Sequence, residues 1–115
     1  MRREDRVLIL HMIEEAENVA SFIAGRSRED LDQDRMLFHA LVRAIEVMGE
    51  AASKVSSETR AASPDVPWKT IVAMRNRLIH GYATIDPAVV WATATSDIPS
   101  VLPALRALTS TGDEE

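Results

Sequence analysis

The chain has 115 residues, a formal net charge of -5 at pH 7 and no cysteine. This length predicts one domain, residues 1–109, followed by a polar, flexible tail, residues 110–115. The absence of cysteine excludes disulfides and thiolate metal sites. No apolar run approaches the ~20 residues that a membrane span requires. We therefore expect a cytoplasmic protein that makes no membrane contact. Because an acidic chain cannot coat nucleic acid broadly, any such contact must be local.

The first predicted element is an amphipathic helix that ends near Gly25. Apolar residues recur along it at helical spacing, while acidic residues fill the opposite face. Next, Ser27 and Asp30 have the spacing of a capping box, which predicts a short turn or helix before the next long element. The apolar stripe of the first helix consists of Ile9, Met12, Ile13, Ala16, Ala20 and Ile23.

A second helix is predicted to begin between Asp32 and Asp34. Gly49 lies inside it, although glycine is about 1 kcal/mol less favourable than alanine in a helix interior. We therefore expect another backbone to pack closely against this helix at Gly49. The apolar stripe of the second helix consists of Leu37, Leu41, Ala44, Ile45, Met48, Ala52 and Val55.

Two proline signals place the third and fourth helices. Pro67 suits the first position of a helix that runs to about His80 and ends at Gly81. Asp86 followed by Pro87 repeats this pattern and predicts a further helix through residues 89–94.

The last part of the domain is predicted to contain one more helical segment, through Leu102, Leu105 and Leu108. We expect Pro99 and Pro103 to kink or break the chain there, because a proline inside a helix removes a backbone hydrogen bond. No segment shows the two-residue period of a strand. The predicted fold is therefore all-α, an antiparallel bundle of four or five helices.

The clearest functional signal lies in the third helix. Residues 66–85 include Lys69, Arg75 and Arg77 but no acidic residue, although the whole chain is acidic. His80 lies near the end of this helix. An imidazole titrates near pH ~6.5 and can transfer protons at neutral pH. A guanidinium stays charged and can hold two phosphate oxygens. Together these groups are typical of phosphodiester cleavage.

The positions of these residues on a helix allow more than one arrangement. Asn76 and His80 are four residues apart and share a face, so the Asn76 amide could orient the imidazole. Arg75 lies about 140° around the helix from His80. Its side chain must therefore curl toward the same pocket or act across a dimer interface. A non-functional interpretation is also open: His80 would be stabilised by the helix dipole, and Arg75 and Arg77 would form a solvated basic face.

Other charged residues give weaker signals. His11 and His39 have no ligand-spaced histidine or carboxylate nearby, so we predict no metal site. Glu46 and Glu50 are one helical turn apart in the second helix. They could support the basic residues of the third helix or form ordinary surface pairs.

The segment 75–82 resembles the Arg-x4-His-x-Tyr signature of HEPN-domain ribonuclease toxins of the HepT type. Arg75, His80 and Tyr82 occupy its three fixed positions. The ordered set of similar segments is more specific than an arginine and a histidine at that spacing alone, and it spans nearly the whole chain. The other similar segments are 43–51, 66–68, 85–86 and 90–91.

The resemblance implies a HEPN-like homodimer that cleaves cellular RNA without metal or cofactor. The RNA 2′-hydroxyl would attack the adjacent phosphate while His80 moves protons and Arg75 holds the charge of the transition state. Asn76 would orient His80 or a phosphate oxygen, and Arg77 would help to position the RNA backbone. The resemblance further implies a partner antitoxin, a minimal nucleotidyltransferase, that adds adenosine monophosphate to Tyr82.

Two other functions fit the same residues. The chain could be a non-catalytic subunit that binds a nucleotide or substrate for a partner nucleotidyltransferase, or it could be a structural dimerisation module. The last function leaves the clustered arginine, histidine and tyrosine unexplained. An activity assay separates the first two.

Overall fold

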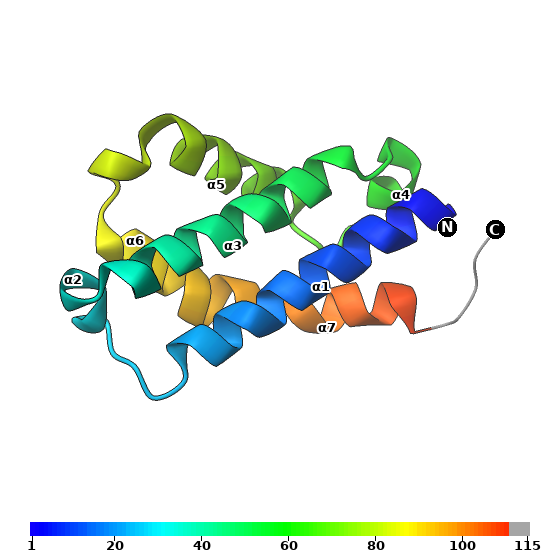
Figure 1. The fold of residues 1–115 in the computed structure, drawn as a ribbon. Coiled ribbons are helices and arrows are strands. Elements are labelled where there is room, and N and C mark those ends of the chain that lie inside the picture. Colours follow the sequence, from blue (N-terminus) through cyan, green and yellow to red (C-terminus); the bar gives the residue numbers. More distant parts are fainter. Residues whose placement is uncertain (111–115) are drawn as a thin grey trace.

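Two long antiparallel helices, α1 (Arg3–Ile23) and α3 (Arg35–Lys54), lie side by side in the bundle (Figure 1). The computed structural model describes residues 1–110, and within this range it contains helices and turns but no strand. α5 (Trp68–Gly81) packs against α3, and α7 (Ile98–Thr109) packs against α1. The predicted all-α antiparallel bundle is confirmed. Most of the predicted tail, residues 111–115, lies outside the described residues.

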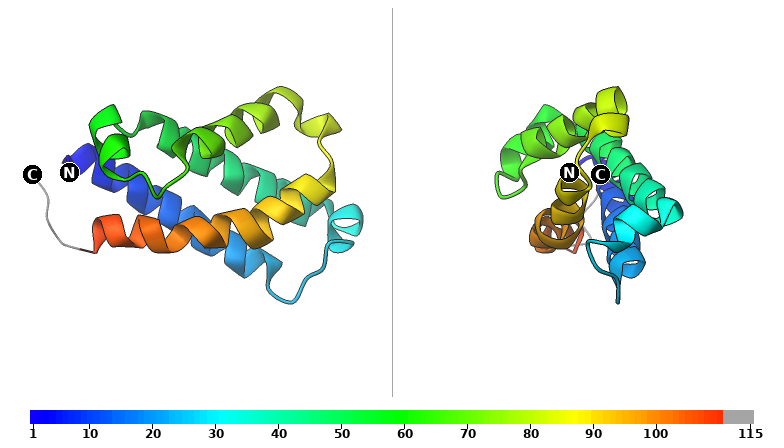
Figure 2. Two further views of the ribbon diagram at one scale, coloured as in Figure 1. Left: turned by 180° about the vertical axis from the view of Figure 1, so that it is seen from behind. Right: turned by 90° about the vertical axis from the view of Figure 1, so that its left-hand side faces the viewer.

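Shorter elements connect the long helices. α2 (Asp30–Gln33) lies between α1 and α3, and α4 (Ser57–Ala62) lies between α3 and α5. After α5 come the 3₁₀ turn η1 (Tyr82–Thr84), the helix α6 (Pro87–Ala92) and the π-helix η2 (Thr93–Asp97). Figure 2 shows that α6, η2 and α7 form one continuous run, which lies with α5 on one side of the α1 and α3 pair.

The hydrophobic core receives fully buried side chains from α1, α3, α5, α6 and α7. The predicted stripe of the second helix is buried at all of its positions. In α1, Val19 is buried and Ala20 is exposed, so the stripe is shifted by one residue at that point. Within residues 1–110, no helix has the length and apolar character needed to cross a membrane. The largest fully buried side chains are Ile9, Met12, Val19, Leu41, Leu78, Val90 and Leu105.

Side-chain caps fix where two of the helices begin. The Asp34 carboxylate accepts a hydrogen bond of 3.1 Å from the backbone N–H of Leu37, which satisfies a donor that the first turn of α3 leaves free. The Asp86 carboxylate accepts a hydrogen bond of 2.9 Å from the backbone N–H of Ala88, and Pro87 lies in the first turn of α6. Both predicted helix starts are confirmed.

The helical segment predicted through Leu102, Leu105 and Leu108 is confirmed as part of α7, but the two prolines that were expected to kink or break the chain do not both interrupt it. The winding changes to a π-helix at η2, directly before Pro99, and Pro99 itself lies in the first turn of α7, where proline is tolerated. Pro103, in contrast, lies inside α7. Its neighbours Val101 and Leu105 are buried in the core, and this packing offsets the loss of one backbone hydrogen bond.

A buried carboxylate connects the first helix to the chain between α3 and α5. Asp5 in α1 is 2% exposed and accepts hydrogen bonds from the backbone N–H of Ser56 at 3.0 Å and from the hydroxyls of Ser56 and Thr59, each at 2.6 Å. Burial by itself raises the pKa of Asp5, but these hydrogen bonds outweigh it and the pKa is lowered. The contact holds the start of α4 against α1.

Candidate functional site at the contact of α3 and α5

The helix that carries the predicted site residues is attached to the bundle on one side only. Of its residues, only Trp68 and Leu78 are buried. The indole N–H of Trp68 donates to the carbonyl oxygen of Ser63 at 3.1 Å, which fixes the start of α5. Much of the rest of α5 is open to solvent. Its exposed residues are the polar Lys69, Thr70, Asn76, Arg77 and His80 and the apolar Ala73 and Ile79.

Gly49 lets α5 come close to α3. A Cβ atom on Gly49 would lie 2.1 Å from the Cβ of Arg75 and 3.2 Å from the carbonyl oxygen of Ile71, so no side chain fits there. The close packing predicted at Gly49 is confirmed. Its consequence is that the stem of Arg75 rests directly on the backbone of α3.

The guanidinium of Arg75 is held by two neighbours. It forms an ion pair with Glu50 of α3 through Nη2, and its Nη1 donates to the Oδ1 of Asn76 at 2.8 Å. The Arg75 side chain is 27% exposed, and its Nε is buried without a hydrogen-bond partner in the described structure. The arginine is therefore fixed both at its stem and at its head, while part of the guanidinium reaches solvent.

Glu50 contacts two cations. Besides Arg75, it meets Lys54 one turn later on α3, with 3.3 Å between Nζ and Oε2. The hydrogen bond with Lys54 and the positive charge of Arg75 hold the pKa of Glu50 below its ordinary value. Glu50 thus supports the basic site and forms a surface pair at the same time. Glu46 makes no ion pair or hydrogen bond with any side chain in the described part of the chain.

His80 lies in the last turn of α5 and is exposed. No described side chain forms a hydrogen bond or ion pair with it. Asn76 lies one turn earlier on the same face; its Oδ1 accepts from Arg75, and no hydrogen bond joins its side chain to His80 in the described structure. The structure brings Arg75 next to Asn76, whereas His80 remains separate and open to solvent.

The two other predicted site residues flank this arrangement. Arg77 is exposed and makes no ion pair with a described residue. Tyr82 begins η1, directly after the last residue of α5, and its side chain lies outside the part of the chain that the structure describes. Gly81 closes α5 in helical conformation, not as the left-handed cap that often ends a helix.

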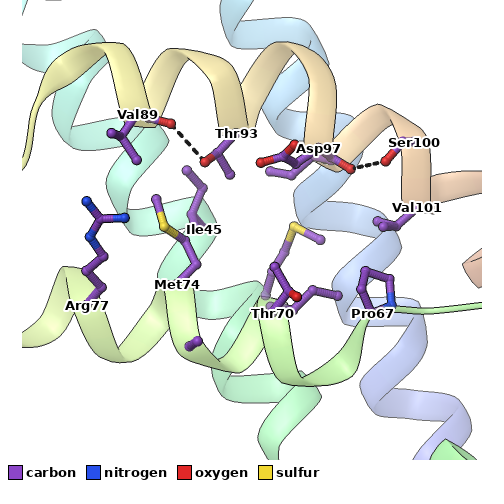
Figure 3. Close-up of a pocket in the computed structure, with 14 residues that line it drawn as sticks. Ile45, Pro67, Thr70, Met74, Arg77, Val89, Thr93, Asp97, Ser100 and Val101 are labelled. Carbon is purple, nitrogen blue, oxygen red and sulfur yellow. Dashed lines mark hydrogen bonds between the residues drawn. The ribbon is translucent and has the colours of Figure 1, made fainter.

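A groove that the sequence did not indicate runs between α5 and the α6 to α7 segment. Figure 3 shows Arg77 and Pro67 at its two ends, with Thr93 and Asp97 across from α5. Its volume is about 420 Å³, and its walls are largely apolar. On the α5 side, Thr70, Ala73 and Arg77 follow one another at helical spacing, which is too weak a pattern to reveal a groove without the position of α6 and α7.

Comparison with known proteins identifies the family. Residues 12–108 match the family described as "Ribonuclease HepT-like". The chain belongs to this HepT-like family. It is 32% identical to "Probable ribonuclease HepT" of Thermococcus cleftensis over 101 residues. These aligned residues make up 88% of this chain and 92% of the relative. No solved structure gives a significant match to the chain.

Two further relatives carry the same kind of name. "Putative RNase TTE0752" of Caldanaerobacter subterraneus subsp. tengcongensis is 35% identical over 96 residues, which is 84% of this chain and 86% of that protein. "Putative RNase MJ1380" of Methanocaldococcus jannaschii is 31% identical over 100 residues, 87% of this chain and 92% of that protein. The family and these names support a ribonuclease function.

The HepT-like match includes every residue of the α3 and α5 contact described above. Among the described residues, no group of three or more His, Cys, Asp and Glu side chains is placed to hold a metal ion. The groups that are placed together are a guanidinium, an amide and a carboxylate, with an exposed imidazole one turn away. These are groups for phosphate binding and proton transfer.

Proposed function

We propose that this chain is a metal-independent endoribonuclease of the HepT-like family, with His80 and Arg75 as its catalytic residues. The observation that supports this best is the fixed guanidinium of Arg75, which lies beside Asn76 on the helix that presents the exposed His80. A preorganised cation can stabilise charge that develops on a phosphate, and an accessible imidazole can exchange protons with an RNA strand.

The reaction is an internal transesterification of RNA. His80 moves the proton from the 2′-hydroxyl as the bond between O2′ and phosphorus forms, and the bond between phosphorus and O5′ breaks. A proton delivered to O5′ completes the step. The products are a 2′,3′-cyclic phosphate and a 5′-hydroxyl. Arg75 stabilises the charge of the pentacoordinate transition state, and Arg77 helps to position the RNA backbone.

We further propose that the active protein is a homodimer that joins its α5 helices. Two features support this. α5 has only two buried residues, and Ile79, next to His80, is 48% exposed. Moreover, Arg75 and His80 are about 140° apart around the helix, which suits a site shared between two protomers better than a site within one chain.

The regulatory part of the proposal concerns Tyr82. In this proposal, the chain is the toxin of a cytoplasmic toxin–antitoxin pair. The antitoxin is a minimal nucleotidyltransferase that transfers adenosine monophosphate to the Tyr82 hydroxyl. The position of Tyr82 two residues after His80 supports this, because an adenylate there adds bulk and negative charge where the RNA phosphate must bind. Cleavage is then blocked without unfolding the toxin.

The proposal is tested by incubating the purified, unmodified protein with total RNA in the presence of a chelator. The expected result is RNA cleavage that persists in the chelator and disappears in His80→Ala and Arg75→Ala. RNA binding without cleavage would instead support the non-catalytic binding subunit.

A further inference from the structure

Arg75 packs against two consecutive residues of α3, Gly49 and Glu50. Gly49 leaves room for the Arg75 stem, and Glu50 binds the guanidinium at Nη2. Asn76 accepts from Nη1, so the planar guanidinium is fixed at both of its terminal nitrogens. A guanidinium has five N–H donors. One donor on each terminal nitrogen is therefore left over after these two contacts.

We propose that Glu50 is a positioning residue for the ribonuclease reaction: it holds Arg75 so that the remaining guanidinium N–H groups are presented to the RNA phosphate. This inference rests on the proposed function of Arg75. An arginine side chain has many rotamers, and each one that does not point at the phosphate lowers the fraction of protein ready to react. A carboxylate from a separate helix removes most of these rotamers before RNA binds.

The exposure of Glu50 separates this role from a role in stability. Its side chain is 44% exposed, and an ion pair in such a position adds little to the stability of a fold. The buried attachment of Arg75 to α3 comes from the stem over Gly49, not from the ion pair. Loss of the Glu50 carboxylate should therefore release the head of Arg75 and leave the bundle intact.

Lys54 explains how a carboxylate can lie beside a phosphate-binding arginine. By itself, Glu50 would repel an RNA phosphate. Its second oxygen is 3.3 Å from Lys54, so two cations surround one carboxylate and the cluster keeps a net positive charge. The cluster can therefore attract a phosphate while Glu50 orients Arg75.

Steady-state kinetics on an oligoribonucleotide provide the first test, with Glu50→Ala and Glu50→Gln compared with the parent. We expect Glu50→Ala to lower kcat about tenfold and to change KM less than about threefold, because the lost interaction acts on the transition state. Glu50→Gln keeps an oxygen that can accept from Arg75, so it should lose less. Melting temperatures should stay within about 2 °C of the parent.

Glu46→Ala is the matched control, because Glu46 lies one turn earlier on α3 and makes no ion pair or hydrogen bond with Arg75. Its kcat should equal that of the parent. If Glu50→Ala leaves kcat unchanged, or lowers it only in proportion to a loss of folded protein, Glu50 does not position Arg75.

Nitrogen-15 NMR of the arginine side chains tests the same point without using activity. In the parent, the fixed guanidinium of Arg75 should rotate slowly and give resolved Nη signals, and Glu50→Ala should average them. Equal rotation in both proteins would overturn the inference. The two proteins could differ in rotation as expected while the parent cleaves no RNA. That result would contradict the proposed function and still support the positioning of Arg75 by Glu50.

Discussion

Gly49 and Arg75 meet where α3 and α5 touch, and a methyl group on Gly49 would lie only 2.1 Å from the Cβ of Arg75. Carbon atoms that are not bonded to each other are normally separated by ~3.5–4 Å, so a methyl group on Gly49 would overlap Arg75. The relationship ties a glycine that a helix ordinarily disfavours to the arginine of the candidate site. It gives that glycine a physical reason for its place inside α3.

Gly49→Ala should therefore destabilise the protein. Helix propensity alone would favour alanine by about 1 kcal/mol, whereas forcing an extra methyl group into a close helix contact costs about 1–3 kcal/mol. The first atom met is rooted in the α5 backbone and cannot turn away, so the cost should prevail. Urea unfolding measures the difference. Gly81→Ala is the stability control, since its nearest neighbour, the Thr84 hydroxyl, would be at 3.5 Å. A Gly49→Ala protein as stable as the parent would contradict the close contact.

His80→Ala should abolish RNA cleavage and leave the fold unchanged. His80 is exposed and bonded to no described side chain, so its removal should alter the free energy of unfolding by less than about 0.5 kcal/mol. Loss of a group that transfers protons in the transition state costs about 10²- to 10⁴-fold in rate. The matched control is His11→Ala, which removes an exposed histidine from α1. Equal activity of both variants would remove His80 from the mechanism.

Asp5 should make stability depend on pH in the acid range. Its pKa in the folded protein is lowered, so the carboxylate contributes fully above the unfolded value of about 3.9, and its contribution is lost as the pH falls through the folded value. Asp5→Asn should be less stable than the parent by about 1–3 kcal/mol at pH 7. Urea unfolding at a series of pH values should show this difference shrinking below about pH 4. A difference that stays constant down to pH 2 would show that the charge of Asp5 has no part in it.

Ile79→Asp should prevent dimerisation and RNA cleavage together. Ile79 is 48% exposed and lies beside His80, so a charge there would be buried in a dimer that joins the α5 helices. Sedimentation velocity gives the oligomeric state. Met36→Asp places the same charge on a residue in the first turn of α3 that is 84% exposed, and this variant should remain dimeric and active. An active parent monomer would rule out the shared site.

Tyr82→Phe should cleave RNA nearly as well as the parent but escape neutralisation by the partner nucleotidyltransferase. The substitution keeps the ring and removes the Tyr82 hydroxyl, which is the proposed acceptor of adenosine monophosphate. Mass spectrometry after co-expression with the partner should find the added adenylate on the peptide that contains Tyr82. Adenylate on another peptide, or a Tyr82→Phe protein that is still neutralised, would make this assignment wrong.

Local signals predicted most of the fold. Asp34 and Asp86 were expected to start helices, and both do, because a cap needs only a side chain and the backbone two or three residues ahead. Gly49 was expected to mark close packing for an equally local reason, the unfavourable placement of glycine inside a helix. The helical segment predicted through Leu102, Leu105 and Leu108 is present as part of α7, but the helix continues past Pro103, where a break had been one expectation, and the buried Val101 and Leu105 stabilise it there.

The site was less predictable. The sequence drew attention to Arg75, Asn76 and His80 and indicated that Asn76 could orient the histidine or a phosphate oxygen, whereas in the structure the Asn76 oxygen accepts from Arg75. Glu50, 25 residues earlier in the chain, forms an ion pair with the same guanidinium. The sequence left open whether Glu46 and Glu50 support the basic residues, and the packing of α5 on α3 shows that Glu50 contacts Arg75. The groove beside Arg77 likewise depends on where α6 and α7 lie.

The most direct test of the mechanism is the chemistry of the cut RNA ends. A defined oligoribonucleotide would be cleaved by the unmodified protein in chelator, its cleavage position mapped, and the same oligonucleotide prepared with a single 2′-deoxynucleotide on the 5′ side of that position. The proposed transesterification predicts a 2′,3′-cyclic phosphate and a 5′-hydroxyl from the first substrate, with cleavage blocked at the modified position in the second. Cleavage of the 2′-deoxy position, or a product with a 3′-hydroxyl and a 5′-phosphate, would contradict attack by the 2′-hydroxyl and with it the roles given to His80 and Arg75.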